Sequence, residues 1–364
     1  MGQAVAGLVG KHKAGGRGQK TAGMVPAVMG VLFLAAFVML VSCAGPTPPQ
    51  TQKGMEKSVD SPVFVPLALP VNRPLQVSFE ADPVRYAAIS GDSKTLAYVL
   101  EKEGVSSLWV WPRDSTSRAR HSLSTHIEAL PQKRLEGLGR ITAPSLSWNA
   151  GRLAFAATDN DAKGDIYVLS GHDRESTPRR LTGRDSADGA PALSPDGTRI
   201  YFQRLLPGEM LPRLATIVLP ADADNLNIPE VETLREGAFP AVSPNGKSLA
   251  FVSFKEDSGG DIRVLNLETE KTNAVTNGSA LDLYPAWSVD GKWIYFSRFN
   301  ADTNGDGAIT FDDNAVICRA RSEGSDLKAY PLTSGTFSAY QPMATPSQIL
   351  FLSNMNGTGN IWAL

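Results

Sequence analysis

The fold is decided by the stretch Tyr284-Pro285-Ala286-Trp287-Ser288-Val289-Asp290-Gly291-Lys292-Trp293-Ile294-Tyr295-Phe296-Ser297. Asp290-Gly291 is a strong signal for a two-residue hairpin of type I′, in which both central residues need a positive φ. After this turn the side chains alternate between two faces, with Ile294 and Phe296 sharing one of them. Such a period of two is typical of a half-buried strand. The stretch therefore predicts a β-hairpin.

The same phrase recurs along the chain, which makes this a repeat protein. In four copies an aromatic residue follows the first-strand proline after 11 residues; the pairs are Pro144 and Phe155, Pro191 and Phe202, Pro240 and Phe251, and Pro285 and Phe296. Two weaker copies extend the series. One runs from Ala87 to Tyr98 without the proline, and the other runs from Pro342 to Phe351 with a turn two residues shorter.

A third β-rich segment follows each copy, and a fourth follows some of them. The third segments are residues 108–111, 165–169, 216–219, 261–265, 315–318 and 360–364. Six such units, about 45 to 60 residues apart, predict an all-β fold, a six-bladed β-propeller of four-stranded blades. The last unit lacks a fourth strand. We expect the N-terminal segment Leu75–Phe79 to pair with it and close the ring, because an open sheet edge is a liability.

The first 43 residues differ from the rest. Five basic residues between Lys11 and Lys20, counting His12, precede an apolar run from Met24 to Val41, and Leu40-Val41-Ser42-Cys43 resembles a bacterial lipobox. This pattern predicts a lipoprotein signal peptide over residues 1–43 with lipidation at Cys43. The alternative is a plain transmembrane anchor, since about 18 apolar residues reach the lower limit for a span.

Residues 44–61 are polar and rich in proline, so they predict a disordered tether between the lipid and a propeller over residues 62–364. With Cys43 lipidated, Cys318 is left single, and we expect it to pack as a small apolar residue in a strand. The net charge of −2 gives no indication of nucleic-acid binding. We expect a monomer.

The repeated phrase Pro-Ala-(Trp/Val/Leu)-Ser-(Pro/Val)-(Asp/Asn)-Gly, followed by an alternating strand and by Asp-Ile-Tyr-Val-Leu, resembles the TolB-type propeller repeat. Members of this family include the periplasmic TolB protein, which binds a peptidoglycan-associated lipoprotein through one propeller mouth. Others are the propellers that shield the active sites of prolyl oligopeptidase-like peptidases. This chain departs from both groups, since we identify no α/β domain before the ring and no hydrolase domain after it. The resemblance therefore implies the fold and does not name the partner.

The sharpest local motif is the insertion Asp302–Asp313 in the fifth copy. On the 12-residue calcium loop, its ligands are Asp302, Asn304, Asp306, the Ala308 carbonyl, Thr310 and Asp313, at positions 1, 3, 5, 7, 9 and 12, with Gly307 at the sharp turn. This spacing wraps hard oxygens around one point, and the Asp at position 12 resembles the dockerin version of the loop. We therefore predict one structural Ca²⁺ site, spliced between strands. The alternative is an acidic surface loop that binds nothing.

Candidates for catalysis are few. After Cys43 the histidines are His121, His126 and His172, in segments expected to be loops, and we find no nucleophile elbow and no phosphate-binding glycine loop. We interpret the Asp-Gly and Asn-Gly turns as structural, and the acidic patch Asp159-Asn160-Asp161 with Asp165 as a solvated hairpin tip. We predict no catalytic residues.

The residue before each first-strand proline is expected near a mouth of the ring: Ala143, Ala190, Phe239, Tyr284 and Gln341, with Tyr340 beside the last. Phe239, Tyr284 and Tyr340 would form an aromatic cluster able to anchor a peptide, although packing between blades explains them equally well.

Together these features predict a non-enzymatic envelope lipoprotein that binds a protein or peptide. Ala44 is not the aspartate that retains lipoproteins at the inner membrane, so we expect the periplasmic side of the outer membrane. The alternative is a propeller enzyme that acts on a carbohydrate or lactone.

Overall fold

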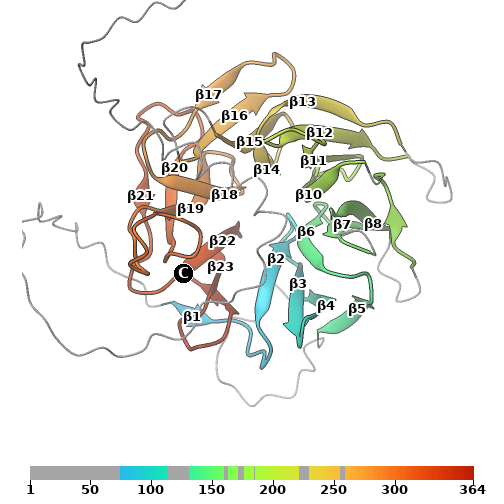
Figure 1. Ribbon diagram of the computed structural model, residues 1–364, viewed down its shortest axis with the longest axis horizontal. Coiled ribbons are helices and arrows are strands. Elements are labelled where there is room, and N and C mark those ends of the chain that lie inside the picture. Colours follow the sequence, from blue (N-terminus) through green and yellow to red (C-terminus); the bar gives the residue numbers. More distant parts are fainter. Residues whose placement is uncertain are drawn as a thin grey trace, which may run out of the picture.

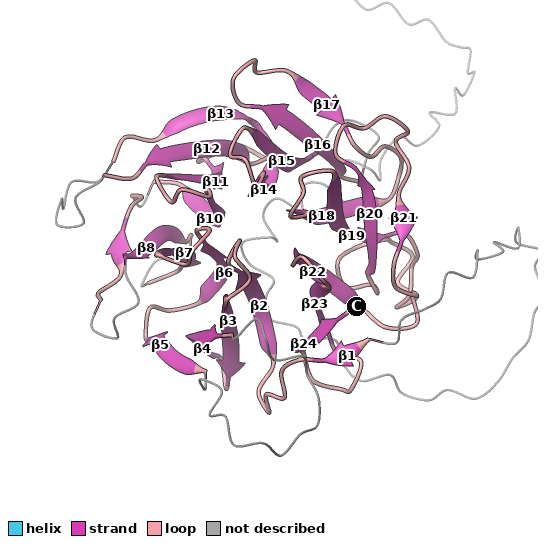
Figure 2. Ribbon diagram, turned by 180° about the vertical axis from the view of Figure 1, so that it is seen from behind, coloured by secondary structure: helices cyan, strands magenta, loops and turns pink. Residues whose placement is uncertain are grey.

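The computed structural model describes residues 74–113, 131–159, 163–170, 176–183, 185–220, 229–254 and 259–364. These residues form strands and loops without a helix, and the strands make six four-stranded antiparallel sheets arranged around one axis (Figures 1 and 2). The predicted all-β, six-bladed propeller is therefore confirmed. The described part of the chain contains no helix long and apolar enough to cross a membrane.

Each blade runs from an inner strand at the axis to an outer strand at the rim. Blades one to three are β2 (Val84–Ile89), β3 (Thr95–Lys102), β4 (Val105–Pro112), β5 (Gln132–Glu136); β6 (Ile141–Leu146), β7 (Arg152–Ala157), β8 (Asp165–Ser170), β9 (Arg179–Arg180); and β10 (Ala187–Leu193), β11 (Arg199–Leu205), β12 (Arg213–Val218), β13 (Glu232–Glu236). Blades four to six are β14 (Ala238–Val242), β15 (Ser248–Ser253), β16 (Asp261–Asn266), β17 (Thr272–Ala274); β18 (Leu281–Trp287), β19 (Trp293–Phe299), β20 (Val316–Arg321), β21 (Tyr330–Pro331); and β22 (Ala339–Ala344), β23 (Ile349–Ser353), β24 (Asn360–Ala363), β1 (Leu75–Gln76).

The ring closes as the sequence predicts. Strand β1 is the outer strand of blade six and pairs antiparallel with β24, with Leu75 opposite Ala363. The closure continues beyond β1, because the Ser78 hydroxyl donates to Asn360 Oδ1 at 2.8 Å and the Glu80 amide donates to the same oxygen at 3.0 Å. Asn360 is buried, so these bonds satisfy its polar side chain inside the fold.

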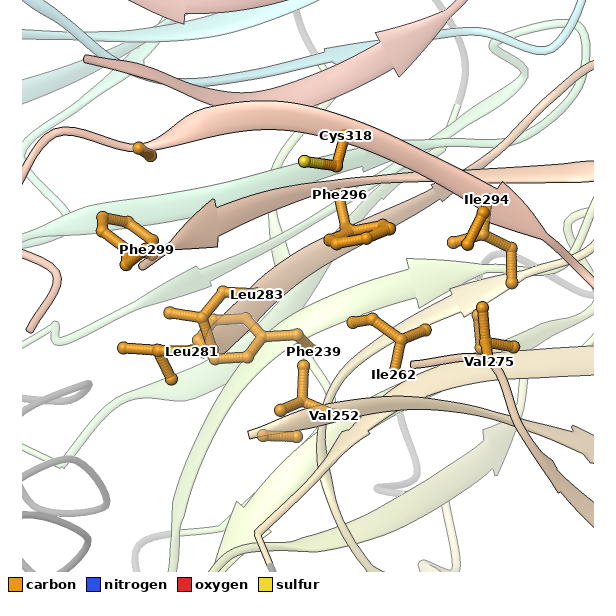
Figure 3. Packing of buried hydrophobic residues seen from close by; sticks show 14 of the residues in the cluster. Phe239, Val252, Ile262, Val275, Leu281, Leu283, Ile294, Phe296, Phe299 and Cys318 are labelled. Carbon is orange, nitrogen blue, oxygen red and sulfur yellow. The ribbon is translucent and has the colours of Figure 1, made fainter. Parts of the chain in front are cut away.

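The core lies between neighbouring blades. The repeat aromatics Tyr98, Phe155, Phe202, Phe251, Phe296 and Phe351 are among the largest fully buried side chains. Between blades four and five, Ile294, Phe296 and Cys318 pack against the side chains of Val252 and Ile262 (Figure 3). The alternation after the Asp-Gly turn therefore buries one face of each blade on the preceding blade. Cys318 packs as expected, and burial raises the pKa of its thiol to about 12.

The turns between the first and second strands correct one expectation. Gly291 has a φ of 71° but Asp290 does not have a positive φ, so the turn is not type I′. Instead the Gly291 amide donates to the Ser288 carbonyl at 2.9 Å, and the Ser288 amide donates to the Trp293 carbonyl at 2.8 Å. The loop is thus longer than two residues, and only its glycine is left-handed.

Side chains hold this turn. The Ser288 hydroxyl donates to Asp290 Oδ1 at 2.6 Å and accepts the Trp293 amide, while Asp290 Oδ1 accepts the Lys292 amide. Equivalent bonds recur around Asp92, Asp196 and Asn245. The acidic turn residues are therefore structural, as the sequence predicts.

Candidate functional site

A cavity of about 230 Å³ lies at the axis of the ring, and residues from all six blades line it. One equivalent position on each inner strand faces it: Tyr86, Ala143, Ala190, Phe239, Tyr284 and Gln341. The inner strands β2, β6, β10, β14, β18 and β22 surround the axis (Figures 1 and 2). The residues before the five first-strand prolines therefore lie at the centre of the ring.

The backbone is unusual at these five positions. Ala143, Ala190, Phe239, Tyr284 and Gln341 have φ values of 44° to 54°, and the pairing register of each inner strand shifts at the same place. A positive φ is uncommon outside glycine, and for bulky residues it is a true outlier. Strain of this kind costs about 1–3 kcal/mol per residue and concentrates at functional sites. The repeat thus holds five strained residues around one cavity.

The aromatic side chains on the cavity form one cluster. Phe239 and Tyr284 meet edge to face with ring centres 4.8 Å apart. Burial, followed by the nearby hydroxyls of Tyr86 and Tyr340, raises the pKa of Tyr284 well above its usual value. The tyrosine therefore stays neutral across the physiological range and can serve as an apolar wall with a hydroxyl.

Of the three aromatic residues predicted at the mouth, two line the cavity and one does not. Phe239 and Tyr284 line the cavity, whereas Tyr340 is half-buried beside it and packs against the cores on both sides of blade six. Burial raises the pKa of Tyr340 to about 12, with Arg85 opposing the shift. Tyr86 was missed. It precedes Ala87, which stands where other copies have proline, so alignment of the weak first copy could have found it.

Polar groups around the cavity have partners within the protein. Asp188 accepts two hydrogen bonds from the Arg204 guanidinium, at 2.8 and 2.7 Å, and is 1% exposed. Gln203 Oε1 accepts the Phe239 amide at 3.2 Å, and the Ser297 hydroxyl accepts the Gln341 amide at 3.0 Å. These side chains fix two of the strained residues from the neighbouring blade, so the cavity wall is pre-organised.

The cavity reaches the face that carries the connections between second and third strands. Thr158 and Lys163 lie in the β7–β8 connection, and Phe311 lies in the β19–β20 connection. Phe311 belongs to the Asp302–Asp313 loop. The predicted calcium loop therefore contributes one side chain to the central mouth.

Hydrogen bonds order that loop. Asp313 is buried and accepts the amides of Thr303, Asn304 and Thr310, while Asp302 accepts the amides of Gly305 and Gly307. Burial acts to raise the pKa of Asp313, but the amides of Thr310, Thr303 and Asn304 outweigh it, and the pKa is lowered.

The loop supplies carboxylate, amide, hydroxyl and carbonyl oxygens, the donor types that a hard cation prefers. In the described residues, however, no three His, Cys, Asp or Glu side chains gather closely enough to hold a metal ion. The Ca²⁺ site at Asp302, Asn304, Asp306, Ala308, Thr310 and Asp313 stays a prediction.

Several predicted features fall outside the described residues. These are the signal peptide with Cys43, the tether over residues 44–61, and His121, His126 and His172.

No protein-family model and no curated protein matches the chain. Among solved structures, TolB from Acinetobacter baumannii is similar with a TM-score of 0.50 at 17% identity, over 75% of this chain and 64% of that one. A candidate TolB from Agrobacterium tumefaciens has a TM-score of 0.48 at 20% identity, over 62% and 73%. An acylaminoacyl peptidase from Pyrococcus horikoshii has a TM-score of 0.47 at 11% identity, over 78% and 45%.

The fold is therefore that of a TolB-like six-bladed β-propeller. At these identities the likeness shows the fold alone, so function has to be argued from the site.

Proposed function

We propose that this protein is a binding scaffold of the cell envelope that holds a protein or peptide segment at its central mouth. The observation that carries this proposal is the cavity at the axis, which six blades line, with strained residues from five of them and the side chains of Tyr86, Phe239 and Tyr284 on its wall. Rigid aromatic side chains dominate binding energy at protein interfaces, and a pre-organised wall lowers the entropy lost on binding.

The size and chemistry of the cavity support a binding role over catalysis. A volume of about 230 Å³ is below the range of about 300–1,000 Å³ typical of small-molecule sites. It suits the side chains of an inserted loop better than an enclosed substrate. Among the described lining residues the one carboxylate, Asp188, is neutralised by Arg204, and histidine is absent. The alternative, an enzyme that acts on a carbohydrate or lactone, has no such support.

The test compares partner recovery after crosslinking in membranes. The double variant Tyr86→Ala/Tyr284→Ala removes two aromatic rings from the mouth, and Phe239 is left intact because it is buried in the core. The control Met210→Ala/Val218→Ala removes exposed apolar side chains from blade three. We expect at least about tenfold lower recovery with the mouth variant, since hot-spot residues cost about 2 kcal/mol or more. Equal recovery from both variants would reject the mouth, and turnover of a sugar or lactone would reject the scaffold.

The lipid anchor is the second part of the proposal. Lipidation at Cys43 would tether the propeller to a membrane and raise its local concentration near envelope partners. The apolar run that ends at Leu40-Val41-Ser42-Cys43 supports it, and the TolB-like fold supports an envelope location on the periplasmic side. Mass spectrometry of the mature protein should find a diacylated Cys43 at its N-terminus. An unmodified N-terminus elsewhere would contradict the anchor.

The third part is a structural Ca²⁺ in the Asp302–Asp313 loop, which would order Phe311 at the mouth. Extracellular calcium modules bind with a Kd of about 10⁻⁴–10⁻³ M, so 1 mM Ca²⁺ should stabilise the fold by about 0.4–1.4 kcal/mol. Asp306→Ala should abolish this stabilisation, whereas Glu323→Gln, an exposed change outside the loop, should not. A wild-type melt that is the same in calcium and in chelator would exclude the site.

A further inference from the structure

A second cluster, separate from the mouth, lies on blade five where it faces blade six. The guanidinium carbon of Arg319 lies 4.4 Å from the centre of the Trp293 ring, and that of Arg321 lies 4.8 Å from it. Tyr330 on the outer strand meets the same ring edge to face at 6.2 Å. Two positive charges thus share one indole.

Neither arginine has a carboxylate partner within the described residues. Salt bridges elsewhere in the ring hold Arg85, Arg180, Arg204 and Arg298, but neither Arg319 nor Arg321 is within salt-bridge distance of an acid. The Nε of Arg319 is shielded from solvent and has no hydrogen-bond partner. Two like charges close to one ring repel each other. The two guanidinium charges are therefore not neutralised by a carboxylate of the described residues, and an anion from solution would relieve their repulsion.

The position of Arg319 is specific to blade five. Arg319 lies opposite Tyr295, and the residues that occupy its place in the other blades are Val110, Val168, Thr216, Val264 and Ala363. Ile317, two residues before it on the same face, packs against Phe351 and Trp362 of blade six. The repeat thus places an apolar residue or threonine at this seam, and blade five alone replaces it with a guanidinium.

The site is open to a ligand from the rim. Arg321 is exposed, Trp293 and Arg319 are half-buried, and Tyr330 is 37% exposed. The Tyr330 hydroxyl donates to Asp326 Oδ2 at 2.8 Å, so this carboxylate is bound to Tyr330 and not to either arginine.

We propose that Arg319 and Arg321, stacked on Trp293, form a binding site for a phosphate dianion. A guanidinium presents a planar fork of N–H donors that matches phosphate oxygens in two-point contacts. Stacking on the ring orients each guanidinium plane, and the terminal nitrogens of Arg319 and Arg321 serve as the donors. A phosphate carries a charge of about −1.5 to −2 at pH 7. It therefore balances the two guanidinium charges better than a carboxylate, which carries a single negative charge.

Calorimetric titration of the full chain tests this site, with inorganic phosphate and glycerol 3-phosphate as separate probes at pH 7.5 and low ionic strength. We expect binding that R319Q and R321Q each weaken by about tenfold or more. K292Q removes one positive charge from the same blade at a side chain that is 73% exposed, and it should leave the affinity within about twofold. Because Arg321 is exposed, R321Q should keep its fold even if R319Q does not. The tighter of the two probes shows whether the ligand is free phosphate or a phosphate monoester.

The pH dependence gives an independent readout. The second pKa of a phosphate monoester is about 6, whereas the arginines stay charged, so binding of glycerol 3-phosphate should weaken several-fold between pH 7.5 and 5.5. Acetate should bind more weakly than either probe. No binding to the wild-type protein, an unchanged affinity in R321Q, or acetate binding as tight as phosphate would each overturn the assignment.

Discussion

At the scale of single residues, one position is left-handed in the turn between first and second strands of each of blades one to five. Glycine occupies it at Gly197, Gly246 and Gly291, but Ser93 and Ala150 take it in the first two blades with φ values of 62° and 58°. A left-handed conformation costs a residue with a side chain about 1–2 kcal/mol. The Ser93 hydroxyl is also buried without a hydrogen-bond partner. Ser93 is thus the weak member of the series.

Replacing Ser93 by glycine should raise the free energy of unfolding by about 1–2 kcal/mol, because it removes both the strain and the unpaired hydroxyl. Urea unfolding measures this. The matched opposite change, Gly197→Ala, places a Cβ 3.2 Å from that of Ser147 at a φ of 71° and should destabilise by a similar amount. Destabilisation by Ser93→Gly would contradict this account of the turn.

The same turns contain the carboxylates whose ionisation matters for folding. The Ser194 hydroxyl, followed by the Thr198 amide, lowers the pKa of Asp196. A carboxyl whose pKa is lower in the folded state stabilises the fold above its unfolded pKa, and that contribution is lost as the pH falls through the folded value. Acid should therefore weaken this turn below about pH 4.

Asp196→Asn should leave stability near pH 7 almost unchanged and make the loss of stability between pH 5 and pH 3 shallower. Asparagine already serves in blade four, where Asn245 accepts from Ser243 at 2.7 Å and from the Lys247 amide at 3.0 Å. Unfolding midpoints across this pH range measure the effect. Parallel pH profiles for the two proteins would show that Asp196 does not contribute.

At the scale of elements, the sequence predicts the strands because the proline-to-aromatic spacing repeats, and each buried aromatic is found where that spacing puts it. Turn geometry was less predictable. Asp290-Gly291 indicated type I′, but the Ser288 side chain stabilises a longer loop that pair statistics do not encode. The strained residues before the prolines were also beyond prediction, since the residue before proline usually favours extended backbone. Hydrogen bonds from the neighbouring blade hold two of them, Phe239 and Gln341.

One of the two candidate sites could likewise be predicted from the repeat, and the other could not. Phe239 and Tyr284 could be placed at the axis from the repeat alone, because every blade presents the same position there. The cluster of Trp293, Arg319 and Arg321 depends on cross-strand pairing between residues far apart in sequence, and no local motif marks it.

At the scale of the whole molecule, ring closure depends on the contacts of residues 75–80 with β24. Relative to a chain that lacks residues 1–73, a chain that lacks residues 1–80 should lose at least about 3 kcal/mol of unfolding free energy. The second truncation exposes the edge of β24 and strips the buried Asn360 of its partners, each worth about 1–3 kcal/mol. Asn360→Ala in the full chain should cost about 2 kcal/mol for the same reason. Equal stability of the two truncations, measured by urea unfolding, would contradict this closure.

The central claim, that the mouth of the ring binds a partner, is tested most directly by photo-crosslinking in intact cells. A photoreactive phenylalanine analogue at Tyr86 lies on the cavity, and the same residue at Trp148, which is 41% exposed in a first-to-second-strand turn, provides an aromatic control outside it. We predict a discrete crosslinked partner from position 86 and none from position 148. A partner captured from position 148 and not from position 86 would contradict the proposed binding mouth.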